Sequence, residues 1–294
     1  MMNGLSFTPC LNAATLDGTG FEDFLRAAAA AGFPAVEVPV QQVAAYGPGR
    51  ARDLLDALGL AAAAASGILP AGPVLPHPVL VSAATYDAAL DGLGGRLDAL
   101  AAIGCPVATI VLNPHCDGDP DAARATAAAR IGDLARVCAG RGITLAVEAV
   151  GVRAGLPPDL DGPGHVAATL PELRDLLGRA GAPPGAVTAC VDSFHWAATG
   201  ADPRHLDGLR VGHLQVADVP PGVPAGQWTD AMRLFPGDGN LDWTALGGAL
   251  SAAGYQGTAS VELFNPQLRA HPDAEVARRA LAAAATCWQH RAER

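Results

Sequence analysis

The sequence predicts an α/β fold, because short apolar runs alternate along the chain with helical stretches rich in alanine and leucine. Strands that alternate with helices are expected to lie parallel, with right-handed crossovers and with the helices outside. Eight apolar runs have the length and composition of buried strands: 5–11, 35–40, 60–66, 107–112, 143–150, 186–191, 211–217 and 258–264. This number favours a closed (β/α)8 TIM barrel over a doubly wound open sheet, and no GxGxxG motif follows the first strand. We therefore expect a single TIM-barrel domain over residues 1–294.

The segments between these runs fit the same fold. Six of them have helical spacing, and several end at a glycine: 21–31, 86–103, 121–139, 170–179, 243–253 and 274–290. Three other connections, 67–82, 151–165 and 218–236, are longer and rich in proline and glycine. In a barrel these connections would follow strands, on the face where such folds place their sites.

Composition excludes several classes of function. The formal charge is -10 and the 19 basic residues form no run, so we expect no nucleic-acid partner. No apolar stretch is long enough to cross a membrane, and the N-terminus lacks the pattern of a secretory signal. The six cysteines form no CxxC pair and show no disulfide spacing. The sequence therefore predicts a soluble cytoplasmic protein without a membrane partner, and it leaves a homo-oligomer open.

Four of the predicted strands end in an acid or an amide, namely Glu148, Asp192, Gln215 and Glu262. Taken singly, each has an ordinary structural explanation, such as a helix cap or an ion pair. In a barrel, however, all four would point into one mouth, where three carboxylates cannot stay ionised without a compensating positive charge. Oxygen ligands of this kind predict one divalent metal ion, with Mg²⁺ or Mn²⁺ favoured and Co²⁺ or Zn²⁺ also compatible.

Two histidines and an arginine lie beside these positions. His195 follows Asp192 by three residues, and we expect it to contact a substrate hydroxyl rather than the metal. His213 precedes Gln215 by two residues, so both point to the same face of the strand, and His213, deeper in the barrel, belongs either to the core or to a second layer around the site. Arg233 precedes the turn LFPGDG, where it either reaches over the mouth to a substrate oxygen or forms a surface ion pair.

Taken in order, these motifs resemble those of a known superfamily. The segments AVEAVG, CVDSFHWAATG, GHLQVAD, MRLFPGDGNLDW and ASVELFNP are similar to the signature series of the sugar phosphate isomerase/epimerase superfamily, the xylose isomerase-like TIM barrels. Within it, the series most resembles the inosose (2-keto-myo-inositol) isomerase family, whose opening strand and turn are similar to CLNAATL. The resemblance implies that Glu148, Asp192, Gln215 and Glu262 bind one metal ion and that His195 and Arg233 contact substrate, and we assign Asn12 and His213 to the substrate site as well.

The chain departs from inosose isomerase at two places. That family and the ketohexose 3-epimerases have histidine at the position of Gln215, whereas hydroxypyruvate isomerase resembles this chain there. The segment VGVRAGLPPDLDGPGH, residues 150–165, is also unlike the corresponding loop of inosose isomerase. The resemblance therefore leaves the substrate open.

The activity implied is a metal-dependent isomerase or epimerase of a small polyhydroxy ketone, either a sugar or a cyclitol such as an inosose. The metal would polarise the carbonyl and stabilise an enediolate, while Glu148 and Glu262 act as base and acid. Return of the proton to the neighbouring carbon gives isomerisation, and return to the opposite face gives epimerisation. Three alternatives are a dehydratase on the same scaffold, a DNA-repair endonuclease of the superfamily, and a sugar-binding barrel without turnover. The endonuclease is disfavoured because neither a His-rich multi-zinc site nor a basic groove is evident.

Overall fold

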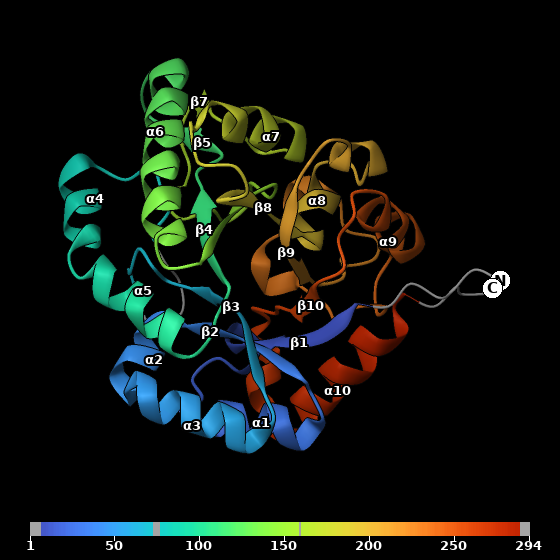
Figure 1. Ribbon diagram of the computed structural model, residues 1–294. Coiled ribbons are helices and arrows are strands. Elements are labelled where there is room, and N and C mark those ends of the chain that lie inside the picture. The colour runs from blue at the N-terminus through green and yellow to red at the C-terminus, as the bar shows by residue number, and fades with distance from the viewer. Residues whose placement is uncertain (1–6, 73–76, 159, 289–294) are drawn as a thin grey trace.

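A computed structural model describes residues 7–72, 77–158 and 160–288 of the chain (Figure 1). Within these ranges, eight parallel strands close into a barrel in the order β1-β10-β9-β8-β6-β4-β3-β2. These strands are β1 (Thr8–Asn12), β2 (Ala35–Pro39), β3 (Ala61–Ser66), β4 (Val107–Leu112), β6 (Thr144–Ala149), β8 (Val187–Asp192), β9 (Val211–Val216) and β10 (Thr258–Val261). The predicted (β/α)8 barrel is confirmed, and each strand overlaps one of the predicted apolar runs.

Helices surround the barrel (Figure 1). They are α1 (Phe21–Ala31), α2 (Val40–Tyr46), α3 (Pro48–Leu58), α4 (Ala83–Leu90), α5 (Leu93–Ala102), α6 (Pro120–Ala139), α7 (Leu170–Arg179), α8 (Ser193–Ala198), α9 (Trp243–Ala252) and α10 (Asp273–Thr286). Helix α1 shows why they pack there: Phe21, Phe24, Leu25 and Ala28 recur at helical spacing and are all buried. Burial of one such phenylalanine or leucine stabilises the fold by about 1.5–3 kcal/mol.

Three helical predictions differ from the structure. The single helix predicted over 86–103 is divided into α4 and α5, because the chain turns at Gly92 with φ of +70°. Helices α2 and α8 directly follow strands β2 and β8, α3 follows α2, and none of the three was predicted. The helix predicted over 274–290 ends at Thr286 in α10, and the end of that prediction, like the start of the predicted strand 5–11, lies outside the described residues.

A small sheet that was not predicted joins two loops at the carboxyl ends of the strands. Strand β5 (His115–Cys116) pairs antiparallel with β7 (Gly164–His165). The approach is close, because a Cβ on Gly162 would lie 2.5 Å from the carbonyl carbon of Cys116. The pairing therefore ties the loop after β6 to the loop after β4 and holds it beside the barrel mouth. No helix in the described ranges is long and apolar enough to cross a membrane.

Candidate active site

A cavity of about 320 Å³ lies at the carboxyl ends of the barrel strands. Its polar lining includes every residue predicted for the site except Asp192 and His213, which are buried behind it: Asn12, Glu148, His195, Gln215, Arg233 and Glu262. Three polar residues that were not predicted, Ser66, Thr109 and Asp230, complete this polar wall, and Asp230 is the acid among them. The barrel thus brings together side chains that lie far apart in the sequence.

Arg233 lies at the centre of the polar wall and is only 1% exposed. Its Nη1 donates to Oδ2 of Asp192 over 2.5 Å and to Oε2 of Glu262 over 3.3 Å. Its Nε donates to Oδ1 of Asp230 over 2.9 Å, and its Nη2 lies 3.2 Å from Nε2 of His195. One buried guanidinium therefore links three carboxylates and the predicted substrate histidine, and the surface ion pair considered for Arg233 is not formed.

The loop that carries Arg233 is held by a buried acid. The carboxylate of Asp218, at the end of GHLQVAD, accepts hydrogen bonds from the backbone N–H groups of Gly237 and Leu241. The backbone of Asp218 also pairs with that of Leu234, next to Arg233. Because an unpaired buried carboxylate is costly, these bonds fix the turn and with it the position of the guanidinium.

Asp192 has two roles at once, one for each carboxylate oxygen. Its Oδ1 accepts from the backbone N–H groups of Phe194 at 2.7 Å and His195 at 3.0 Å, which caps helix α8. Its Oδ2 is bound to Arg233. The helix cap that the sequence left as one explanation of Asp192 is therefore present, and its role as a metal ligand stays a prediction.

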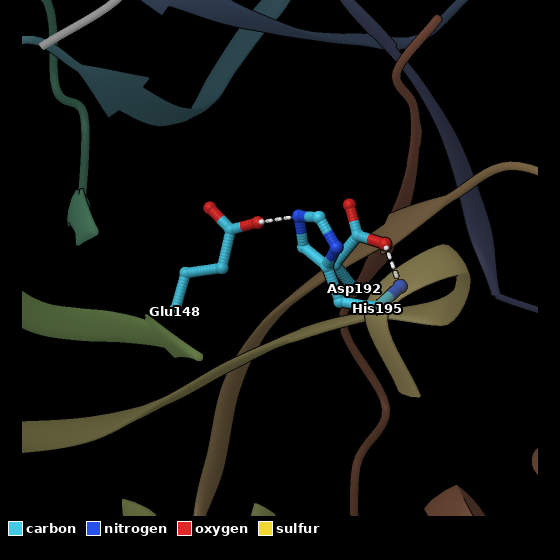
Figure 2. Close-up of side chains that lie close together, drawn as sticks. All are labelled: Glu148, Asp192 and His195. Carbon is cyan, nitrogen blue, oxygen red and sulfur yellow. Dashed lines mark hydrogen bonds and ion pairs between the residues drawn. The ribbon is translucent and has the colours of Figure 1, made fainter. Parts of the chain in front are cut away.

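Glu148 and His195 face each other across the end of the barrel, and Figure 2 shows their side chains pointing toward one another. Oε1 of Glu148 lies 3.5 Å from Nε2 of His195. One ligand atom from each of Glu148, Asp192 and His195 lies within 4.8 Å of the others. A carboxylate pair and an imidazole this close together could hold a cation.

The buried acids of the site differ in the direction in which their pKa is shifted. Burial, reinforced by the negative charge of Asp192, raises the pKa of Glu148 well above its usual range despite the attraction of Arg233. Burial likewise raises the pKa of Glu262. Burial would raise the pKa of Asp192 too, but the adjacent guanidinium outweighs it and the pKa is lowered. The same burial lowers the pKa of His195, which favours the neutral imidazole.

A second layer of polar residues lies beneath the cavity. Glu37, on β2, accepts from Nε2 of His213 at 2.8 Å, from Oγ of Ser260 at 2.8 Å and from Nε2 of Gln215 at 3.1 Å. Both Glu37 and His213 are 1% exposed, so His213 lies in the layer beneath the substrate site. Its assignment to substrate contact stays a prediction.

Gln215 connects this layer to the cavity. Its Nε2 donates to Glu37 and also to Oε1 of Glu262 at 3.0 Å, while its amide oxygen accepts from Sγ of Cys190 at 3.2 Å. Asn12 donates to the same Glu262 oxygen over 2.9 Å. The carboxylates of Glu37 and Glu262 both accept from the NH2 group of the Gln215 amide. The oxygen of Gln215 could therefore bind a metal ion only if the amide turned away from these two carboxylates.

Comparison with known proteins assigns the chain to a family. The family described as "Xylose isomerase-like TIM barrel" matches residues 25–287. The chain belongs to this family. Its resemblance to the sugar isomerase superfamily, stated from the motifs, is thereby confirmed.

Individual relatives are matched over shorter stretches. The chain is 32% identical to a 3-dehydroshikimate dehydratase of Pseudomonas putida over 113 residues, which are 37% of this chain and 18% of that protein. It is 36% identical to an inosose isomerase of Bacillus subtilis over 80 residues, 26% of this chain and 28% of that protein. Both matches span less than a third of the relative's length. In shape, the chain is similar to the IolI protein solved with a bound zinc atom, with a TM-score of 0.80, 18% identity, and coverage of 94% of this chain and 96% of that one.

The site residues fit the divalent cation that the family resemblance implies. Nη1 of Arg233 already lies between Asp192 and Glu262, so a positive charge is stabilised there. Among the described side chains, Nδ1 of His195 is buried without a hydrogen-bond partner. The raised pKa of Glu148 marks a carboxyl group that lacks sufficient positive charge around it.

Sequence reasoning missed Glu37 and Asp230. Glu37 is an acid inside the apolar run AVEVPV, which is the same signal that singled out the four predicted ligands. Asp230 lies three residues before Arg233 in a loop, and nothing in the sequence pattern distinguishes it from a solvated acid. Its position becomes visible only when the loop folds over the barrel.

Proposed function

We propose that this protein is a divalent-metal-dependent isomerase or epimerase of a small polyhydroxy ketone, a sugar or a cyclitol such as an inosose. The observation that carries the proposal is that Glu148 and Glu262 face one cavity, are both buried, and both have a raised pKa. A general acid or base works best when its pKa lies closer to the working pH than that of an ordinary carboxyl group.

The cation would be held by Glu148, Asp192 and Glu262, with Gln215 or His195 as a further ligand. Mg²⁺ or Mn²⁺ suits the oxygen ligands, while Co²⁺ or Zn²⁺ is compatible with an imidazole, and the zinc atom bound by the IolI protein is in keeping with that. When bound, the cation would supply positive charge to the carbonyl and hydroxyl oxygens of the substrate.

The chain's own groups supply the proton transfer. One of Glu148 and Glu262 removes the proton from the carbon next to the carbonyl, and the other returns a proton to the neighbouring carbon or to the opposite face. Neutral His195 lines the same cavity and can donate a hydrogen bond to an oxygen on which negative charge develops, while Arg233, whose nitrogens are paired with protein groups, contributes its positive charge beside it. Asn12 holds Glu262 in place through its amide.

The test is exchange of substrate C–H for solvent deuterium. The purified protein, stripped with chelator and reloaded with Mn²⁺, is expected to exchange this proton in at least one member of a panel of ketoses and inososes. Glu148→Gln and Glu262→Gln should each abolish exchange while leaving the fold intact. Binding of a sugar without exchange in the unmodified protein would contradict the proposal and favour a binding barrel.

A dehydratase is the second candidate, and one observation favours it. Among the relatives described above, the 3-dehydroshikimate dehydratase is matched over the longer stretch of this chain. The first step would be the same proton removal, followed by loss of a hydroxyl group from the next carbon. Mass spectrometry separates the two outcomes, because dehydration lowers the mass of the product by one water molecule and isomerisation leaves it unchanged.

The six cysteines are free thiols, which supports the expected cytoplasmic location. A small-molecule substrate remains the expected partner, because the cavity is enclosed by the barrel mouth and its loops.

A further inference from the structure

Among the described residues, the cavity has few groups with which to bind an anion. The sequence of the chain contains no lysine, so all 19 Lys and Arg residues are arginine. Among the described residues that line the cavity, Arg233 is the one arginine. Each of its three nitrogens is already paired, with Asp192 and Glu262 at Nη1, with Asp230 at Nε, and with His195 at Nη2.

Negative charge is in excess around the same cavity. Glu148, Asp230 and Glu262 line it, and Asp192 and Glu37 are buried directly behind them. A divalent cation would add two positive charges to that of Arg233, and the negative charges of the ionised carboxylates would still outnumber the positive charges. An anionic group on a substrate would therefore lose its hydration and meet net repulsion.

The backbone groups at the start of α8 do not supply a second anion site. The N–H groups of Phe194 and His195, at the start of α8, point to a place where a phosphate could bind, but the carboxylate of Asp192 occupies it. The rest of the cavity lining is largely apolar and includes Val111, Val150 and Leu156. A substrate that fits such a cavity has hydroxyl groups toward the acids and hydrocarbon toward this wall.

Asp230 is the acid of the group with the greatest access to solvent. Its side chain is 43% exposed, whereas that of Glu262 is 10% exposed. Its Oδ1 lies 2.9 Å from Nε of Arg233 and 4.0 Å from Nε2 of His195. Asp230 therefore sets the charge that a ligand meets beside the predicted substrate contacts.

We infer that this cavity selects ketones that carry no anionic group, and that Asp230 is a residue that determines this specificity. The inference rests on the proposed function and narrows it to uncharged substrates. It also separates the two candidate functions, because 3-dehydroshikimate carries a carboxylate whereas an inosose does not.

The experiment measures kcat/KM for deuterium exchange in the Mn²⁺-loaded protein with two pairs of ketones. One pair is D-fructose and D-fructose 6-phosphate, and the other is 2-keto-myo-inositol and 3-dehydroshikimate. The uncharged member of a pair should be preferred by at least about a hundredfold. Asp230→Asn keeps the size of the side chain and its acceptor oxygen but removes the charge, so the preference should shrink by about tenfold, through a lower KM for the anion. The matched control is Asp98→Asn, which removes an acid from an Asp–Arg pair with Arg141 outside the cavity.

The outcomes separate the inference from the proposed function. Exchange at similar kcat/KM in both members of a pair, or faster exchange in the anion, overturns the inference and leaves the proposed function standing. An Asp230→Asn variant whose preference equals that of Asp98→Asn overturns the role of Asp230. Absence of exchange in all four ketones overturns the proposed function for these substrate classes and removes the basis of the inference.

Discussion

The guanidinium of Arg233 lies 2.5 Å from the carboxylate of Asp192, although the two residues are 41 positions apart, and both side chains are almost completely buried. Asp192 ends a barrel strand, and Arg233 belongs to a loop folded over the mouth. Their contact joins the loop to the barrel through an ion pair that water does not reach.

Removal of Arg233 should therefore destabilise the protein strongly. Arg233→Met leaves Asp192 buried without its cation, and we expect the free energy of unfolding of the metal-free protein to fall by about 3–5 kcal/mol in urea denaturation. The loss should be smaller with Mn²⁺, because the ion can take over part of the positive charge. The control Arg269→Met removes an exposed ion pair with Asp17 and should cost less than about 1 kcal/mol. Equal losses in the two variants would contradict this account.

Glu148→Gln should stabilise the metal-free protein at neutral pH while it abolishes activity. Because the pKa of Glu148 is raised in the folded state, the folded protein binds a proton that the unfolded chain has released. The stability of the unmodified protein should thus fall as the pH rises above about 4.3, the ordinary pKa of glutamate. The glutamine variant lacks this loss of stability. The free energies of unfolding of the two proteins should therefore differ at pH 7 and converge near pH 4. Urea denaturation in chelator at several pH values measures the difference, and a gap that does not depend on pH would refute the burial argument.

Metal binding should stabilise the folded protein, because the ligands come together only there. At a free Mn²⁺ concentration of about a hundred times Kd, the expected gain is about 2.7 kcal/mol, seen as a higher Tm after chelator is replaced with Mn²⁺. Asp192→Asn should remove most of this gain, whereas Asp133→Asn, on the outer helix α6, should keep it. A gain of the same size in Asp192→Asn would show that the ion binds elsewhere.

The layer beneath the cavity should control metal affinity indirectly. Glu37 accepts hydrogen bonds from His213, Ser260 and Gln215. Burial would raise the pKa of its carboxyl, but the interactions with His213 and Ser260 outweigh it and the pKa is lowered. Glu37→Gln should lower Mn²⁺ affinity by about 10–100-fold in calorimetry, because Gln215 and Glu262 lose their fixed orientation. Ser260→Ala removes one hydrogen bond from the same carboxylate and should cost about 1 kcal/mol of stability with little change in affinity. Equal Mn²⁺ affinity in the two variants would show that Glu37 stabilises the fold and does not control metal binding.

The fold was predictable because its signals are local. Each strand and most of the helices are indicated by the spacing of apolar residues within a short window. Parallel strands in a barrel must also end on the same side. This is why Glu148, Asp192 and Glu262 could be placed in one mouth before their distances were known. The break between α4 and α5 escaped prediction because a single residue, Gly92, decides it through its φ angle.

The sequence by itself determined the barrel, the side on which the candidate site lies, and most of the acids and bases proposed for it. Only the tertiary structure decided their partners: that Glu37 holds His213 and Gln215, that Asp230 and Arg233 form a pair in the cavity, and that the Gln215 amide donates to Glu262. The physical reason is that a strand end is fixed by local periodicity, whereas a hydrogen-bond partner from another strand or loop is fixed by barrel register and loop packing.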